Sequence, residues 1–186
     1  MNNAESSTVT QVRFGGVGGQ GIVLSGRLLG KAASLYDGKS AVCTQSYGPE
    51  ARGGASRADV VISDDTVDYP FVIEADVLAV FFQEAYDMFR KGLRPGGLLL
   101  VDSDLVHPSE DDEVFHSVPA TRTAEDLGNK MAANVVMLGY LIGATNVVSR
   151  ESVESAIRST VKAKIVDFNL NAFGIGLDLA HKDGLS

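Results

Sequence analysis

Apolar and polar positions along the chain follow two periods in turn, one typical of strands and one typical of helices. Thr8–Phe14 alternates as a strand does, and after a run of glycines the apolar residues of Ile22–Tyr36 recur with helical spacing. Further apolar runs predict strands at 40–44, 58–63, 76–82 and 98–101, and a short apolar run follows at 114–118. Helical spacing predicts helices at 84–91, 150–162 and 167–180. Strands that alternate with helices predict a mostly parallel sheet.

A long helical pattern begins at Thr121, and Thr121 or Thr123 is predicted to cap its first turn. Its apolar face comprises Leu127, Met131, Val135, Leu138 and Ile142. Because its middle is apolar nearly all round, we expect this helix to lie between other elements, with Gly139 permitting a close approach. Together, the elements predict an α/β fold of Rossmann-like type, with a mostly parallel sheet flanked by helices.

The length and composition favour a single domain. A chain of 186 residues with 45% hydrophobic content can bury a core of ordinary size. Residues 1–8 are polar and read as a frayed N-terminus, which leaves 9–186 for the domain. No apolar stretch approaches the roughly 20 residues of a membrane-spanning helix, so no membrane span is expected and we expect a cytoplasmic protein.

Cysteine content and charge exclude several functions. Cys43 is the one cysteine, so the chain cannot supply a disulfide or a four-cysteine cluster, and its apolar strand predicts a small core residue. The net charge is -8 with no run of lysine and arginine, which argues against nucleic acid as a ligand. The three histidines have no spacing that would place a metal on one helix face.

A glycine-rich segment between the first strand and the first helix carries the clearest chemistry. It contains Gly15, Gly16, Gly18, Gly19, Gln20 and Gly21, with G-x-G-x-x-G formed by Gly16, Gly18 and Gly21. Glycines let a ligand approach the backbone, and the N-terminus of the following helix attracts an anion such as a phosphate or diphosphate. The alternative is a tight turn that needs glycine only for packing.

A nicotinamide-binding domain places Asp or Glu near the end of its second strand, where it holds the ribose hydroxyls. Here positions 43–46 are Cys, Thr, Gln and Ser, and no carboxylate occurs until Glu50. A ligand with phosphates but without the nicotinamide half is therefore favoured over a dinucleotide.

A second irregular segment, Tyr47–Gly54, is rich in glycine and charge. Its candidate binding residues are Tyr47, Glu50, Arg52 and Gly53. At the carboxyl edge of a parallel sheet this loop would lie close to the glycine turn, so Arg52, and also Arg57, could face a bound phosphate or a partner carboxylate. The alternative is a solvated loop with an internal contact between Glu50 and Arg52.

Several of these segments, taken in order, resemble the gamma subunit of 2-oxoacid:ferredoxin oxidoreductases. The resemblance covers almost the whole chain, and the loop at 47–54 is most similar to the 2-oxoglutarate type, with pyruvate and ketoisovalerate types as relatives. The matching segments are Gly15–Gly21, Tyr47–Gly54, Leu93–Gly97, the strand end at Asp102 and Ser103, Asn134–Gly139 and Asn169–Phe173.

The resemblance implies an oxidoreductase, active only within a complex, that converts a 2-oxoacid and coenzyme A to an acyl-CoA, carbon dioxide and reduced ferredoxin in anaerobic metabolism. Thiamine diphosphate with Mg and the iron-sulfur clusters are then expected on alpha, beta and delta companion subunits, because this chain lacks both the cysteines and a thiamine motif. Ferredoxin would be contacted only indirectly. The chain itself is expected to position coenzyme A and to build the assembly, without a catalytic residue of its own.

Three other interpretations stay open at this level. They are a stand-alone NAD(P)- or flavin-dependent reductase, a non-catalytic scaffold subunit whose glycine turn meets only another subunit, and the beta subunit of an indolepyruvate oxidoreductase.

Overall fold

The computed structural model describes residues 8–46, 54–112 and 114–185. Six strands form one sheet in the order β2-β3-β1-β4-β5-β6. They are β1 (Val9–Val17), β2 (Ser40–Ser46), β3 (Ala55–Ser63), β4 (Ala75–Val80), β5 (Leu93–Asp102) and β6 (His116–Val118). The pairs β1–β4, β4–β5 and β5–β6 are parallel, whereas β3 is antiparallel to both β1 and β2. The mostly parallel sheet is confirmed, with β3 as the one strand of the six that runs in the opposite direction.

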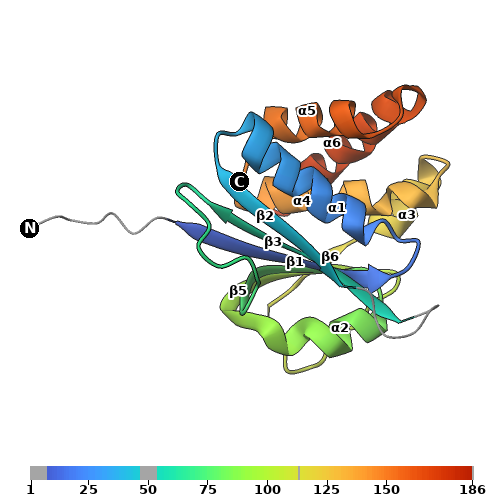
Figure 1. The fold of residues 1–186 in the computed structure, drawn as a ribbon. Helices are drawn as coiled ribbons and strands as arrows, with labels where there is room; N and C mark the ends of the chain where they lie inside the picture. Colours follow the sequence, from blue (N-terminus) through green and yellow to red (C-terminus); the bar gives the residue numbers. More distant parts are fainter. Residues whose placement is uncertain (1–7, 47–53, 113, 186) are drawn as a thin grey trace, which may run out of the picture.

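Helices cover both faces of this sheet, in unequal number (Figure 1). One face carries α2 (Gln83–Phe89) with the short turn η2 (Arg90–Gly92). The other face carries α1 (Ile22–Lys31) with its continuation η1 (Ala32–Tyr36), α3 (Ala120–Asp126), η3 (Lys130–Ala132), α4 (Ala133–Thr145), α5 (Arg150–Thr160), η4 (Ala163–Ile165) and α6 (Val166–Lys182). The predicted α/β architecture of one sheet between helical layers is therefore confirmed.

The apolar helix α4 lies between the sheet and α6, as its composition predicts. Gly139 on α4 and Gly176 on α6 form the contact, because a Cβ on Gly139 would lie 2.2 Å from the Phe173 carbonyl oxygen and one on Gly176 only 2.0 Å from the Val136 carbonyl oxygen. The two backbones therefore touch without intervening side chains. The apolar face of Leu138 and Ile142 is buried within this chain and is not available to a partner.

The helical pattern that begins at Thr121 is two helices and not one. Gly128, at φ +92°, ends α3, and the Asn129 side chain then accepts a hydrogen bond from the Met131 N–H (3.0 Å) and caps η3. Neither predicted threonine cap forms, since the N-cap of α3 is Pro119. Because of the break, Met131 is 54% exposed, although its spacing predicts a core position.

Two further sequence predictions are wrong in detail. The strand predicted at 98–101 begins at Leu93, so Pro95, Gly96 and Gly97 lie inside β5; Gly96 takes φ +73° and the register against β4 shifts between Ala75 and Val77. Cys43 is exposed on the edge strand β2, although its side chain faces Gly26 and Gly30 of α1, where a Cβ on Gly26 would lie 3.3 Å from the Cys43 Sγ. In the described ranges no helix is long and apolar enough to cross a membrane.

Candidate functional site

The glycine turn lies at the carboxyl edge of the parallel strands and is shorter than the Gly15–Gly21 segment predicts. Gly15 and Gly16 belong to β1. A Cβ on Gly15 would lie 2.8 Å from the Phe89 ring, and one on Gly16 would lie 2.6 Å from both the Gln20 Oε1 and the Ile22 Cδ1 atoms. These two glycines therefore allow close packing. For the first part of the motif, the alternative that glycine is needed only for packing holds.

Gly18 and Gly19 form the turn itself and face open space. A Cβ at either position would meet no atom within 4 Å, and Gly19 has φ +93°. Gly21 then takes φ +75° as the N-cap of α1, without a side-chain cap and without an acidic residue in the first turn. Since the first N–H groups of a helix have no partner within it, the start of α1 keeps its partial positive charge for an external anion.

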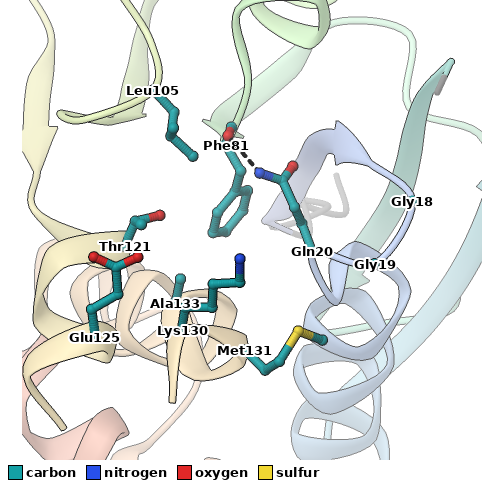
Figure 2. Close-up of a pocket in the computed structure, with 10 residues that line it drawn as sticks. All are labelled: Gly18, Gly19, Gln20, Phe81, Leu105, Thr121, Glu125, Lys130, Met131 and Ala133. Carbon is teal, nitrogen blue, oxygen red and sulfur yellow. Dashed lines mark hydrogen bonds between the residues drawn. The ribbon is translucent and has the colours of Figure 1, made fainter. Parts of the chain in front are cut away.

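Gln20 holds the turn in place rather than reaching toward a ligand. Its Oε1 accepts a hydrogen bond from the Val17 N–H (2.8 Å), and its Nε2 donates to the Phe81 carbonyl oxygen (2.9 Å; Figure 2). The side chain thus bridges the ends of β1 and β4. On the other side of the turn, the Asn134 Nδ2 donates to the Gly21 carbonyl oxygen (3.2 Å). This contact with the glycine motif explains in part why the Asn134–Gly139 segment resembles the gamma subunits.

A cavity of about 390 Å³ opens beside Gly18 and Gly19 (Figure 2). It is lined by Gly18, Gly19, Gln20, Phe81, Leu105, Thr121, Glu125, Lys130, Met131 and Ala133. Phe81, Leu105 and Met131 supply apolar surface, while Lys130 is the one cation and Glu125 the one anion among the described residues that line it. Its volume is near the lower end of about 300–1,000 Å³ for ligand pockets, so it fits part of a cofactor.

Asp102, at the end of β5, orients the far wall of the cavity. Its Oδ2 accepts hydrogen bonds from the Thr121 N–H (3.0 Å) and the Thr121 hydroxyl (2.7 Å), which fixes the first turn of α3. Burial raises the pKa of the Asp102 carboxyl above its ordinary value, and the hydrogen bonds from Thr121 act in the opposite direction. Asp102 is completely buried and therefore supports the site without contacting the cavity.

Of the other predicted binding residues, Gly15, Gly16 and Gly21 do not line this cavity. Tyr47, Glu50, Arg52 and Gly53 lie outside the described residues. Ser46 and Ala55, which bound the described strands on either side, lie at the same edge of the sheet as Val17, because Val17 pairs with Ala55 and Ser46 with Arg57. Arg57 does not line the cavity, and its Nε lies 3.6 Å from the buried Asp59 carboxylate. Its contact with a phosphate or a partner carboxylate stays a prediction.

Lys130, Glu125 and Thr121 were not candidates on sequence grounds. Lys130 and Glu125 look like ordinary surface charges along a helical pattern. The sequence contained one indication that Lys130 lies near a site. Lys130 stands four residues before Asn134, the first residue of a segment that matches the gamma subunits.

The strand order argues against a nicotinamide site. The strand that follows α1 in sequence, β2, is separated from β1 by β3. A residue at its end therefore cannot occupy the place next to β1 where a dinucleotide-binding domain holds the ribose. Asp59, on the adjacent strand β3, is buried and paired with Arg13.

Comparisons with known proteins agree with this fold. Residues 11–179 match the family described as pyruvate ferredoxin/flavodoxin oxidoreductase. The 2-oxoglutarate synthase subunit KorC of Methanocaldococcus jannaschii is 47% identical over 97% of this chain and 98% of its own length. The KorC subunit of Methanothermobacter marburgensis is 48% identical over 91% of this chain and 95% of its own length.

Solved structures give the same result. The gamma subunit of a keto/oxoacid ferredoxin oxidoreductase from Geobacter sulfurreducens matches with a TM-score of 0.81 and 41% identity, over 93% of this chain and 99% of that one. The 2-oxoglutarate:ferredoxin oxidoreductase of Magnetococcus marinus, solved with 2-oxoglutarate, coenzyme A and succinyl-CoA bound, matches with a TM-score of 0.84 and 25% identity, over 94% of this chain and 31% of that one. The chain therefore belongs to the pyruvate ferredoxin/flavodoxin oxidoreductase family, as a homologue of the gamma subunits of 2-oxoacid:ferredoxin oxidoreductases.

Proposed function

We propose that this chain is the gamma subunit of a cytoplasmic 2-oxoglutarate:ferredoxin oxidoreductase that forms succinyl-CoA, carbon dioxide and reduced ferredoxin. The choice of 2-oxoacid rests on identity, which is 47% and 48% to two 2-oxoglutarate synthase subunits but 38% to a ketoisovalerate oxidoreductase subunit and 33% to a pyruvate synthase subunit. With a single cysteine, the chain cannot provide four thiolates for an iron-sulfur cluster. The clusters, thiamine diphosphate and Mg²⁺ are therefore assigned to alpha, beta and delta companion subunits.

The role proposed for this chain is to bind and orient coenzyme A, and the open turn at Gly18 and Gly19 is the observation that carries it. The turn lies at the uncapped start of α1 and borders a cavity that both polar and apolar side chains line. A diphosphate is the part of coenzyme A that suits a helix N-terminus, and apolar surface suits the neighbouring parts of the molecule. When bound, coenzyme A supplies the thiol that accepts the acyl group, and the residues of this chain only hold it.

Composition of the complex and substrate choice test the assignment. The tagged chain, purified from its source, is expected to bring down subunits with a thiamine-diphosphate site and a ferredoxin-type cysteine pattern. The purified complex is expected to reduce ferredoxin with 2-oxoglutarate and coenzyme A faster than with pyruvate, 2-ketoisovalerate or indolepyruvate. A lone chain that binds NADH at micromolar concentration would contradict the proposal and support a stand-alone reductase.

Replacing Gly18 by valine is expected to raise the KM for coenzyme A about tenfold, which corresponds to roughly 1.4 kcal/mol. The valine side chain meets no atom of the protein at Cβ and therefore fills the space proposed for the ligand. We expect the KM for 2-oxoglutarate and the subunit composition to be unchanged, as measured by steady-state kinetics and size-exclusion chromatography of the complex.

Gly174→Val is the matched control, since Gly174 on α6 also has open space around its Cβ and lies away from the cavity. Dissociation of the Gly18→Val complex, with an unchanged KM for coenzyme A in the fraction that stays assembled, would favour the scaffold alternative.

An exposed apolar cluster between β3 and β4 supports the proposed role in assembly. Tyr69, Phe71 and Ile73 are 56%, 54% and 69% exposed, and the rings of Tyr69 and Phe71 pack edge to face at 5.6 Å. The Gln11 Oε1 accepts a hydrogen bond from the Ile73 N–H (2.9 Å) and ties the segment to β1. Grouped exposed aromatic residues are typical of protein interfaces.

We propose that a companion subunit covers this apolar cluster. The ketoisovalerate oxidoreductase subunit VorA of Methanothermobacter marburgensis matches 93% of this chain with only 37% of its own length, so this domain is there joined to further polypeptide. The cluster lies at the opposite end of the sheet from the glycine turn, because it precedes the start of β4 whereas the turn follows the end of β1 (Figure 1). Docking there leaves the cavity accessible.

The double replacement Phe71→Ser and Ile73→Ser is expected to weaken assembly at least tenfold, because it removes two apolar anchors from the proposed contact. Analytical ultracentrifugation over a dilution series measures the effect. Leu35→Ser, at a residue 66% exposed on η1, serves as the control for a lost surface hydrophobe. Equal stability of both variant complexes would contradict docking at this cluster.

A further inference from the structure

Lys130 is the charged side chain best placed to meet an anion in the cavity beside the glycine turn. Its amine points into the space between Gln20, Phe81 and Thr121 (Figure 2). The backbone at this position is fixed by Gly128, at φ +92°, and by the cap that Asn129 provides to η3. Within the part of the chain that the structure describes, no carboxylate lies within 4.0 Å of the Lys130 amine.

A second charge lies on another wall of the same cavity. Glu125 and Thr121 are one turn apart on α3, and Figure 2 shows both side chains bordering the open space. Thr121 is immobilised by its two hydrogen bonds to Asp102, whereas Glu125 is exposed. The cavity thus offers a cation and a carboxylate that do not neutralise each other by direct contact.

Opposite charges in one cavity select a ligand that carries both kinds of group. A small free anion attracted by Lys130 is repelled by Glu125, so the two effects on it partly cancel. A longer molecule with a phosphate at one end and N–H donors further along satisfies both side chains. The apolar walls formed by Phe81, Leu105 and Met131 suit the segment that joins the two ends.

We infer that Lys130 binds the diphosphate of coenzyme A together with the turn at Gly18 and Gly19, and that Glu125 accepts a hydrogen bond from an N–H group of the same molecule. This inference rests on the proposed function and adds the two side chains that set its ligand specificity. Coenzyme A has such donors on both sides of the diphosphate, in the amino group of adenine and in the amides of pantetheine. Lys130 and Glu125 are positioning residues and take no part in the transfer of the acyl group.

Lys130→Met in the assembled complex tests the first part. We expect a rise of about tenfold or more in the KM for coenzyme A, because a hydrogen bond to a charged group is lost, with kcat at saturating coenzyme A and the KM for 2-oxoglutarate unchanged. Lys130→Arg keeps the charge and is expected to restore most of the affinity. Lys91→Met removes the same charge at an exposed position away from the cavity and controls for the overall field.

Glu125→Ala tests the second part through two effects of opposite sign. Inorganic pyrophosphate, with Mg²⁺ in excess, is expected to compete with coenzyme A several-fold more strongly, because a like charge is gone. The KM for coenzyme A itself is expected to rise several-fold, because an acceptor is lost. Asp126→Ala, at the next exposed position of α3, is the control. Inhibition by ADP and by pantetheine then shows which donor Glu125 meets, since only one of the two should weaken in Glu125→Ala.

The outcomes separate this inference from the function on which it rests. If Gly18→Val raises the KM for coenzyme A but Lys130→Met changes it less than twofold, the role inferred for Lys130 is wrong, whereas the role of the glycine turn in binding coenzyme A stands. If neither variant changes this KM, the turn does not bind coenzyme A and both proposals are overturned. If both Glu125→Ala effects have the same sign, or neither ADP nor pantetheine binds more weakly, the role of Glu125 is wrong.

Discussion

Gly176→Ala is expected to lower the free energy of unfolding by about 3 kcal/mol or more, since overpacking a close contact costs about 1–3 kcal/mol and more where backbone must move. A Cβ at Gly176 would lie 2.0 Å from the Val136 carbonyl oxygen and 2.9 Å from the Tyr140 nitrogen, both of them backbone atoms of α4. Because α4 is buried between the sheet and α6, it cannot shift away without opening the core.

Gly174→Ala provides a matched control in the same helix. A Cβ at Gly174 meets no atom within 4 Å, so this variant should be as stable as the natural protein or gain up to about 1 kcal/mol from the better helix propensity of alanine. Chemical denaturation followed by circular dichroism measures both variants. Equal stability of the two would mean that α4 and α6 do not touch through Gly176.

Arg13→Met is expected to destabilise the protein by about 3 kcal/mol or more, because it removes the close partner of a buried carboxylate and leaves Asp59 only the longer contact with the Arg57 Nε at 3.6 Å. The Arg13 guanidinium donates two hydrogen bonds to the Asp59 carboxylate, at 2.7 and 2.8 Å, and the two side chains are only 7% and 4% exposed. A third donation, to the Val72 carbonyl oxygen at 3.1 Å, holds the segment before β4. The same denaturation experiment measures the loss.

Combining Arg13→Met with Asp59→Leu separates lost pairing from lost packing. Replacing both partners by apolar residues also removes the buried Asp59 charge, so the double variant is expected to recover much of the stability that Arg13→Met loses. Arg150→Met is the control for a surface pair, because Arg150 is 60% exposed beside Glu154 and such pairs contribute less than about 1 kcal/mol. A double variant less stable than Arg13→Met would contradict this account.

Glycines serve two different purposes in this chain. Gly139 and Gly176 let helices touch, and Gly15 and Gly16 let a strand pack against Phe89 and Gln20. Within the Gly15–Gly21 segment, Gly18 and Gly19 alone leave open space at a cavity. The seven-residue motif therefore combines packing glycines with glycines that face a cavity, although all of them look alike in the sequence.

Local patterns in the sequence determined the elements, because periodicity records which side of a strand or helix is buried. The strand at Thr8–Phe14, the helix that starts at Ile22 and the helix after Ser149 all form, and Ser149 accepts a hydrogen bond from the Ser152 N–H at 3.3 Å as a cap. The order of several motifs along the chain was also sufficient to identify the family. The break between α3 and η3 was harder to predict, because the apolar pattern continues through Gly128 and only the positive φ angle of this residue ends the helix.

Tertiary structure decided which residues meet, because contacts between distant segments leave no periodic trace. The reversed direction of β3 and the edge position of β2 follow from pairing across the sheet, and they expose Cys43 and hold Asp59 against Arg13. The cavity joins Gly18 and Gly19 to Glu125 and Lys130, more than a hundred residues further along the chain. The sequence alone thus identified a subunit of a 2-oxoacid oxidoreductase and predicted an anion-binding turn in it. Only the fold, by bringing α3 and η3 to the end of β1, supplied the charges beside it.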